Sequence, residues 1–168
     1  KLPALPGDVP TIKDWEDHMT TVFPEVRLKQ FLEMRGTDGG PWGNLCALPA
    51  FWVGLLYNDD ALAAASGFIG DWSYEEIEAL RADVPRFALR TRFRGSTVQD
   101  LALEVLAMAK DGLARRAKPD GKNQDETSFL DPLLEIAESG VTPADEILAL
   151  YDGAWNGDVT PVFEKLAY

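Results

Sequence analysis

The sequence is poor in the residues that build disulfide frameworks and zinc sites. Its 168 residues include one cysteine, Cys46, and one histidine, His18. One cysteine excludes a disulfide within the chain and is typical of a reducing compartment, so a cytoplasmic location is predicted. The lack of a histidine and cysteine cluster excludes a zinc centre of that type. We interpret Cys46 as a small core residue and His18 as a packed or surface side chain.

Positive charge is also scarce. Lysine and arginine number 16 against 28 aspartates and glutamates, which gives a formal net charge of -12 at pH 7. Such a surface repels nucleic-acid backbones and anionic lipid, so neither nucleic acid nor a membrane is expected as a partner. The longest apolar run, residues 45–57, is too short to span a bilayer and contains Pro49. No Walker, Rossmann or G-x-S-x-G motif is present.

Apolar residues, by contrast, are plentiful. They make up 46% of the chain, which is enough for one globular domain with a core. The opening residues, KLPALPGDVP, do not begin with methionine and are rich in proline, which predicts an extended linker. We therefore expect this chain to come from the interior of a longer protein. The chain itself is predicted to consist of a linker and short helix (1–24), a strand with a glycine-rich turn (25–40) and a helical layer (41–168).

Helical signals dominate the residues after 40. The apolar segment 43–56 predicts a buried helix, and Ser73 followed by Glu76 is a capping box that opens another. Apolar residues at three- and four-residue spacing make 97–117 the strongest helical segment. Together with a short helix at 14–21, the predicted helices span 43–56, 59–69, 73–83, 97–117, 129–138, a segment from 142 onward and one from 161 to the end.

Residues 26–35 change to a period of two, which predicts a β-strand. A lone strand leaves backbone donors and acceptors unpaired, so it needs partner strands, and residues 88–94 are the second candidate in this chain. The predicted fold class is α+β, predominantly helical, with one or two strands. The charged face of the strand at 26–35 carries Arg27, Lys29, Glu33 and Arg35.

Two interpretations of this charged face stay open on the residues alone. The more frequent one is a solvent-exposed edge strand, in which Glu33 forms a weak ion pair. The other is the floor of a ligand site, in which Glu33 holds Mg²⁺ and Arg35 takes a phosphate through its planar fork of donors. The glycine turn after Arg35 would let the backbone approach such a ligand. The basic stretch 90–94 is interpreted as a solvated strand or turn, with an anion or partner site as the alternative.

Several stretches, taken in order, resemble the carboxy-terminal part of plant-type glutamate–cysteine ligases, a family that includes bacterial enzymes. They are KLPALPG, HMTTVFPEVRLKQFLEMRGTDGGPW, LCALPAFWVGLLY and GVTPADEILALYDGAWNGDVTPVFEKLAY. The likeness runs through the whole chain, and PEVRLK-x-x-LEMRG-x-DGGPW is long and specific. Plant members carry a cysteine of a regulatory disulfide in the first stretch. This chain has Ala4 there, so the resemblance implies that this redox switch is absent.

The resemblance implies an enzyme that phosphorylates the γ-carboxylate of glutamate with ATP and Mg²⁺, after which the amine of cysteine displaces the phosphate. It implies Glu33 as the metal ligand and Arg35 as the catalytic contact to the transferring phosphate. Arg27 and Lys29 are implied as contacts to a substrate carboxylate or phosphate. The implied partners are glutamate, cysteine and ATP, together with a missing amino-terminal part of the same enzyme.

The implied fold is a glutamine-synthetase-like antiparallel sheet with helices outside, to which this chain adds one or two strands and a helical layer. Because the remaining metal ligands would lie in the missing part, the chain alone is expected to be inactive. Two alternatives stay open. One is an independent helical binding domain without catalysis, and the other is a related ligase that joins glutamate to an amine other than cysteine.

Overall fold

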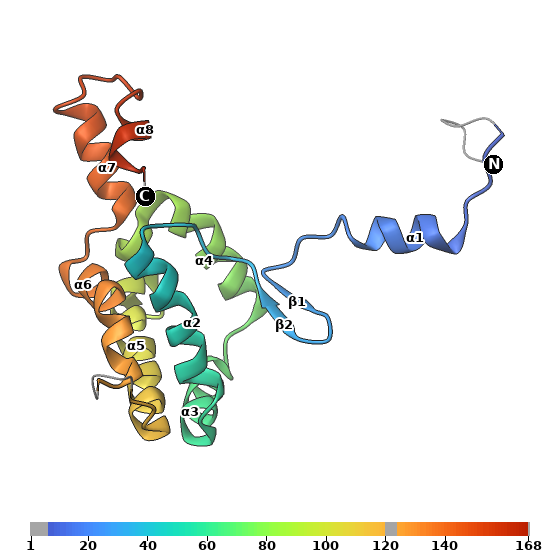
Figure 1. Cartoon of the computed structure of the whole chain (residues 1–168), viewed down its shortest axis with the longest axis horizontal. Helices are drawn as coiled ribbons and strands as arrows, with labels where there is room; N and C mark the ends of the chain where they lie inside the picture. The colour runs from blue at the N-terminus through green and yellow to red at the C-terminus, as the bar shows by residue number, and fades with distance from the viewer. Residues whose placement is uncertain (1–6, 120–123, 168) are drawn as a thin grey trace. The chain divides into compact units, whose positions relative to one another are not determined.

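The computed structural model describes residues 7–119 and 124–167 and divides the chain into two units, Lys1–Asp38 and Gly39–Tyr168. Figure 1 shows the elements of both units. The start of the predicted linker, with Ala4, lies outside the described residues. The described part is mostly helical and contains two small antiparallel sheets, which confirms a predominantly helical α+β chain. Its place in a glutamine-synthetase-like sheet stays a prediction.

The first unit begins with a helix, α1 (Ile12–Met19), close to the predicted 14–21. A capping box sets its start, because the Thr11 hydroxyl accepts from the Asp14 N–H while the Asp14 carboxylate accepts from the Thr11 N–H at 2.7 Å. None of the described residues of this unit is buried. The unit is therefore a helix and a hairpin without a hydrophobic core of its own.

The predicted strand at 26–35 is in fact a hairpin of two short strands, β1 (Val26–Leu28) and β2 (Leu32–Met34). The prediction of a single strand is wrong because Leu28 pairs with Leu32 across a three-residue loop. A loop of three residues keeps the parity of the alternation, so one long strand and this hairpin have the same sequence pattern. The two strands pair with each other, and Arg27, Glu33 and Arg35 stay on one face.

The second unit is built on the packing of α2 (Trp42–Leu56) against α5 (Val98–Arg116), with α3 (Asp59–Ile69) beside them. A Cβ added to Gly54 would lie against the Ala109 carbonyl, and one added to Gly112 would lie against the Gly54 carbonyl. The absence of side chains at these two points lets the helix backbones touch. The core that surrounds this contact consists of Ala50, Leu55, Ala109, Leu113 and Leu130.

Helix α4 (Tyr74–Phe87) starts as predicted, with the Ser73 and Glu76 side chains forming a capping box. The predicted end before Pro85 is wrong, because the helix continues through that residue to Phe87. A proline in the last turn removes only one intrahelical N–H donor, which this helix tolerates so close to its end.

A second hairpin follows α4, after a 3-10 turn, η1 (Ala88–Arg90). Its strands are β3 (Arg92–Phe93) and β4 (Ser96–Thr97), joined by Arg94 and Gly95 with φ of +47° and +82°. Positive φ at both loop residues is the geometry of a type I′ turn, which matches the twist of paired strands. The segment predicted as a possible strand therefore contains one, with a partner strand that the sequence pattern did not indicate.

The remaining helices occur where they were predicted, with small shifts at their ends. Thr142 forms a capping box with Asp145 at the start of its helix. None of the helices within the described residues is long and apolar enough to cross a membrane. The last elements are η2 (Glu126–Leu130), α6 (Asp131–Ser139), α7 (Pro143–Asp152) and α8 (Val162–Lys165).

Candidate active site

The β1–β2 hairpin brings three of the four predicted site residues together. Arg27 and Glu33 are opposite each other in the strand register, and Arg35 follows Glu33 on the same face. Arg27 Nε donates to Glu33 Oε2 at 2.7 Å, and Arg35 Nη1 donates to the same oxygen at 3.4 Å. Lys29 lies in the loop between the strands, exposed, and within the described residues it forms no ion pair with the carboxylate.

The three cations keep Glu33 ionised. The hydrogen bond from Arg27 is the main reason that the pKa of Glu33 is lowered. Desolvation opposes this shift, and the positive charges of Arg27, Lys29 and Arg35 lower the pKa further. The side chain of Glu33 is 31% exposed, so it is accessible to a ligand from solvent. The site is thus an anionic oxygen surrounded by guanidinium groups.

Arg35 also has an aromatic neighbour that the sequence pattern did not indicate. The Arg35 guanidinium carbon lies 4.8 Å from the centroid of the Phe23 ring. The backbone N–H of Arg35 donates to the Glu25 carbonyl at 2.8 Å, which continues the strand pairing by one residue. Phe23 precedes the alternating segment, so no periodic signal links it to Arg35, and only the hairpin geometry brings the two side chains together.

The described part of this unit does not hold Mg²⁺ by itself, but Glu33 fits the role of one ligand in a larger set. Within the described ranges, no group of three or more histidine, cysteine, aspartate or glutamate side chains could enclose a metal. Proteins usually bind Mg²⁺ through one or two carboxylates together with substrate phosphates and water. Both arginine contacts are to Oε2 of Glu33, so its Oε1 is the oxygen suited to a metal. Glu33 can therefore supply one ligand of a larger set.

Gly36 and Gly40, two of the glycines after Arg35, each lie close to the side chain of a residue nearby in the sequence or hairpin. A Cβ on Gly36 would lie against the Glu25 carboxylate, and a Cβ on Gly40 would lie 3.2 Å from the Cβ of Asn44. Nothing in these contacts tests the prediction that the turn admits a ligand.

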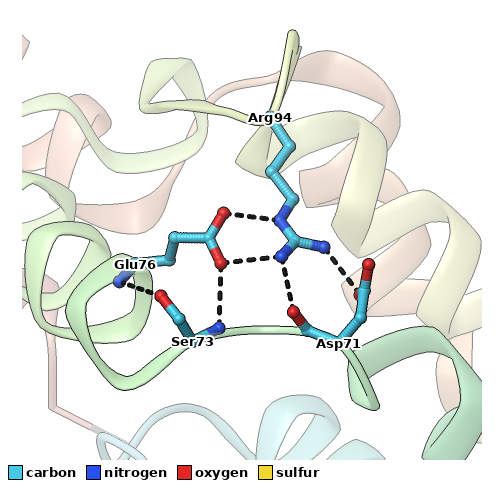
Figure 2. Close-up of polar contacts among 4 residues, drawn as sticks. All are labelled: Asp71, Ser73, Glu76 and Arg94. Carbon is cyan, nitrogen blue, oxygen red and sulfur yellow. Dashed lines mark hydrogen bonds and ion pairs between the residues drawn. The ribbon is translucent and has the colours of Figure 1, made fainter.

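In the basic stretch 90–94, predicted as a solvated strand or turn, Thr91 and Phe93 are buried and Arg94 is held by ion pairs within the chain. Arg94 donates to both carboxylate oxygens of Glu76 at 2.7 Å, to the Asp71 carboxylate at 2.6 Å and to the Asp71 carbonyl at 2.7 Å (Figure 2). The bonds from Arg94, together with the bond from the Ser73 N–H, lower the pKa of Glu76 to about 2, and the bonds to Glu76 and Asp71 raise the pKa of Arg94. Because carboxylates of the chain itself occupy these donors, Arg94 joins the β3–β4 turn to the start of α4.

The lone cysteine and histidine have no catalytic surroundings in the described structure. Cys46 is half-buried and not fully in the core, and it lines a shallow apolar pocket of about 250 Å³ with Phe129 and Glu126. His18 is exposed in the last turn of α1, with its ring centroid 5.9 Å from that of Trp15. The interpretation of His18 as a surface residue is confirmed.

The comparison with known families covers both units. The sequence model of Glutamate-cysteine ligase family 2 (GCS2) matches residues 7–165. The chain therefore belongs to this family, and the resemblance seen in its motifs is confirmed.

Individual relatives are plant enzymes. The whole chain is 53% identical to glutamate–cysteine ligase, chloroplastic, of Arabidopsis thaliana, of which it covers 31%. It is 52% identical to glutamate–cysteine ligase A, chloroplastic, of Oryza sativa subsp. indica (33% covered) and 51% identical to the chloroplastic ligase of Brassica juncea (32% covered). The chain thus spans about a third of the length of the curated relatives it matches.

The predicted cytoplasmic location is wrong, because these relatives are named as chloroplastic enzymes. The prediction rested on a single cysteine, which indicates a reducing environment and does not distinguish one reducing compartment from another.

Proposed function

We propose that this chain is part of a ligase that joins glutamate to cysteine with ATP and so forms γ-glutamylcysteine, the first step of glutathione synthesis. The observation that carries the proposal is the family match over residues 7–165. Relatives that are about 50% identical over the whole chain are named for the same activity. A carboxylate is a poor acyl donor, so ATP would first convert the γ-carboxylate of glutamate into an acyl phosphate, from which the amine of cysteine displaces phosphate.

Within this reaction the β1–β2 hairpin has the charges needed beside a nucleotide. Glu33 would be one carboxylate ligand of Mg²⁺, which when bound would offset the negative charge of the phosphates. Arg35 would contact the transferring phosphate, because a guanidinium presents N–H donors at the spacing of phosphate oxygens. Arg27 and Lys29 are candidates for contacts to a substrate carboxylate or phosphate. Support for these roles comes from the shared face and the short distances around Glu33.

The remaining ligands of such a site would come from other parts of the protein. The relatives are about three times as long as this chain, and its described residues contain no cluster that could hold a metal alone. We therefore propose that the 168-residue chain does not catalyse the reaction by itself. Robust formation of γ-glutamylcysteine by this chain, supplied with glutamate, cysteine and MgATP, would contradict the proposal.

The test uses the full-length enzyme with Glu33→Gln and, separately, Arg35→Met. Loss of one charged contact to the reacting group should lower kcat on the order of 100-fold. Raising the Mg²⁺ concentration should partly rescue Glu33→Gln but not Arg35→Met, because only the first weakens metal binding. The matched control is Glu16→Gln, an exposed carboxylate on α1 in the same unit, which should keep the wild-type rate.

The assay is γ-glutamylcysteine formation, with folding checked by circular dichroism. Near-normal rates in both site variants would show that the hairpin charges are surface features, even if the wild-type enzyme is a ligase. Absence of product from the wild-type enzyme, with phosphate still released from ATP in the presence of glutamate and another amine, would instead favour a different acceptor.

A further inference from the structure

Arg27 and Arg35 contact the same oxygen of Glu33, but the two arginines are held in different ways. Arg27 makes a short charge-assisted hydrogen bond of 2.7 Å, whereas the Arg35 contact of 3.4 Å is near the limit for a hydrogen bond. Within the residues that the structure describes, these are the ion pairs that the two guanidinium groups form. Arg27 is thus committed to the carboxylate, and most donors of Arg35 are left for another acceptor.

What holds Arg35 more closely is the aromatic ring of Phe23. The guanidinium carbon lies 4.8 Å from the ring centroid, within the range of a cation–π interaction. Such an interaction acts on the delocalised charge of the guanidinium and uses none of its N–H donors. The ring can therefore restrict the arginine side chain without occupying the groups that would bind a phosphate.

Phe23 is not placed there by a hydrophobic core. Its side chain is 71% exposed, and none of the described residues in its unit is buried. A second exposed aromatic, Phe31, lies in the hairpin loop at 62% exposure, and among the described contacts no arginine lies over its ring. The two phenylalanines differ in their relation to an arginine, and Phe31 is therefore a matched control for Phe23.

We propose that Phe23 is a positioning residue for Arg35: its ring restricts the guanidinium to an orientation in which it can donate hydrogen bonds to the terminal phosphate of the nucleotide. This inference rests on the proposed function, because it requires Arg35 to contact that phosphate. Phe23 does not touch the substrate in this role. It reduces the side-chain freedom that a long arginine would otherwise lose on binding.

The size of the effect follows from the strength of the contact. An exposed cation–π pair corresponds to a change of about two- to fivefold in a binding constant. Phe23→Leu in the full-length enzyme should therefore weaken binding of the non-hydrolysable nucleotide MgAMP-PNP by about two- to fivefold and lower kcat by a similar factor. Phe23→Tyr keeps the ring and should retain wild-type values, and Phe31→Leu should have no effect.

A double-mutant cycle separates positioning from a general structural role. Titration calorimetry with MgAMP-PNP is run on the wild-type enzyme, Phe23→Leu, Arg35→Met and the double variant. If Phe23 acts through Arg35, Phe23→Leu should have no further effect once Arg35 is replaced by methionine. The inference is overturned if Phe23→Leu weakens binding equally in both backgrounds, if Phe23→Tyr is as weak as Phe23→Leu, or if Arg35→Met leaves binding unchanged.

The two readouts also distinguish this inference from the proposed reaction. Coupling between Phe23 and Arg35 in nucleotide binding, in an enzyme that forms no γ-glutamylcysteine, would support the positioning role and refute the reaction. Product formation that depends on Arg35 but shows no such coupling would support the reaction and refute the role of Phe23.

Discussion

The contact between α2 and α5 gives a sharp prediction about stability. Replacing glycine by alanine in an exposed helix normally stabilises a protein, because the helix propensity of alanine is more favourable by about 1 kcal/mol. At Gly112, however, the new methyl group would meet the Gly54 carbonyl and lie 3.0 Å from the Cβ of Ala61. Overpacking costs about 1–3 kcal/mol, and the upper end applies because the obstacle is a backbone atom of a neighbouring helix. Gly112→Ala should therefore lower the free energy of unfolding by about 2 kcal/mol net of the propensity gain.

Gly67 in α3 is the matched control. A Cβ there meets nothing within 4 Å, so Gly67→Ala should keep the propensity gain and stabilise the protein. Thermal unfolding followed by circular dichroism measures both variants, at roughly 2–4 °C per kcal/mol for a chain of this size. We expect Gly112→Ala to unfold about 4–8 °C below the wild type and Gly67→Ala to unfold above it. Equal or higher Tm for Gly112→Ala would refute the close approach of the two helices.

Two further predictions concern the Arg94 contacts. The folded-state pKa of Glu76 is about 2 against an ordinary 4.5, so its charge stabilises the fold fully above pH 4.5 and this contribution is lost as the pH falls through about 2. Glu76→Gln keeps the cap but removes the charge, so its Tm should fall less than that of the wild type between these pH values. The Tm of Glu75→Gln should fall as much as that of the wild type. Arg94→Asn suits the left-handed backbone at this position but removes four hydrogen bonds, so the amides of β3 and β4 should exchange hydrogen faster. Unchanged exchange would show that these hydrogen bonds contribute little to the hairpin.

Helix starts could be predicted from the sequence because their signals are local. Ser73 with Glu76, and Thr142 with Asp145, satisfy the first N–H groups of their helices through residues three positions apart. The end of α4 has no such local signal. Pro85 predicts a break, but the helix continues to Phe87. Helix ends are therefore the less predictable boundaries.

The two hairpins escaped prediction for different reasons. At 26–35 the alternation is the same for one strand and for two strands joined by a three-residue loop, so the pattern contained no information on the turn. The second hairpin turns at Arg94 and Gly95, where φ is positive at both residues. An Asn-Gly pair is the usual signal for such a turn, and an arginine at the first position does not resemble it.

The candidate site shows the same division between what is local and what is not. Spacing alone placed Arg27, Glu33 and Arg35 on one face, and the hydrogen bonds to Glu33 confirm that they meet. The aromatic neighbour of Arg35 comes from outside the repeating segment, and a contact of that kind depends on how the chain enters the hairpin. No periodic pattern predicts it.

Arg94, Arg27 and Arg35 differ in how many of their N–H donors are bonded to acceptors of the protein itself. Arg94 donates to four acceptors of the protein itself, so a ligand would have to break an existing ion pair to bind there. Arg27 is held by one short bond to Glu33, whereas Arg35 has one long contact to the same oxygen and an aromatic ring that occupies no donor. Anion binding is favourable when the arginine donors give up hydrogen bonds to water. It is unfavourable when they must first give up hydrogen bonds to protein acceptors. Of the three, Arg35 meets this condition best, and this supports the phosphate contact proposed for it.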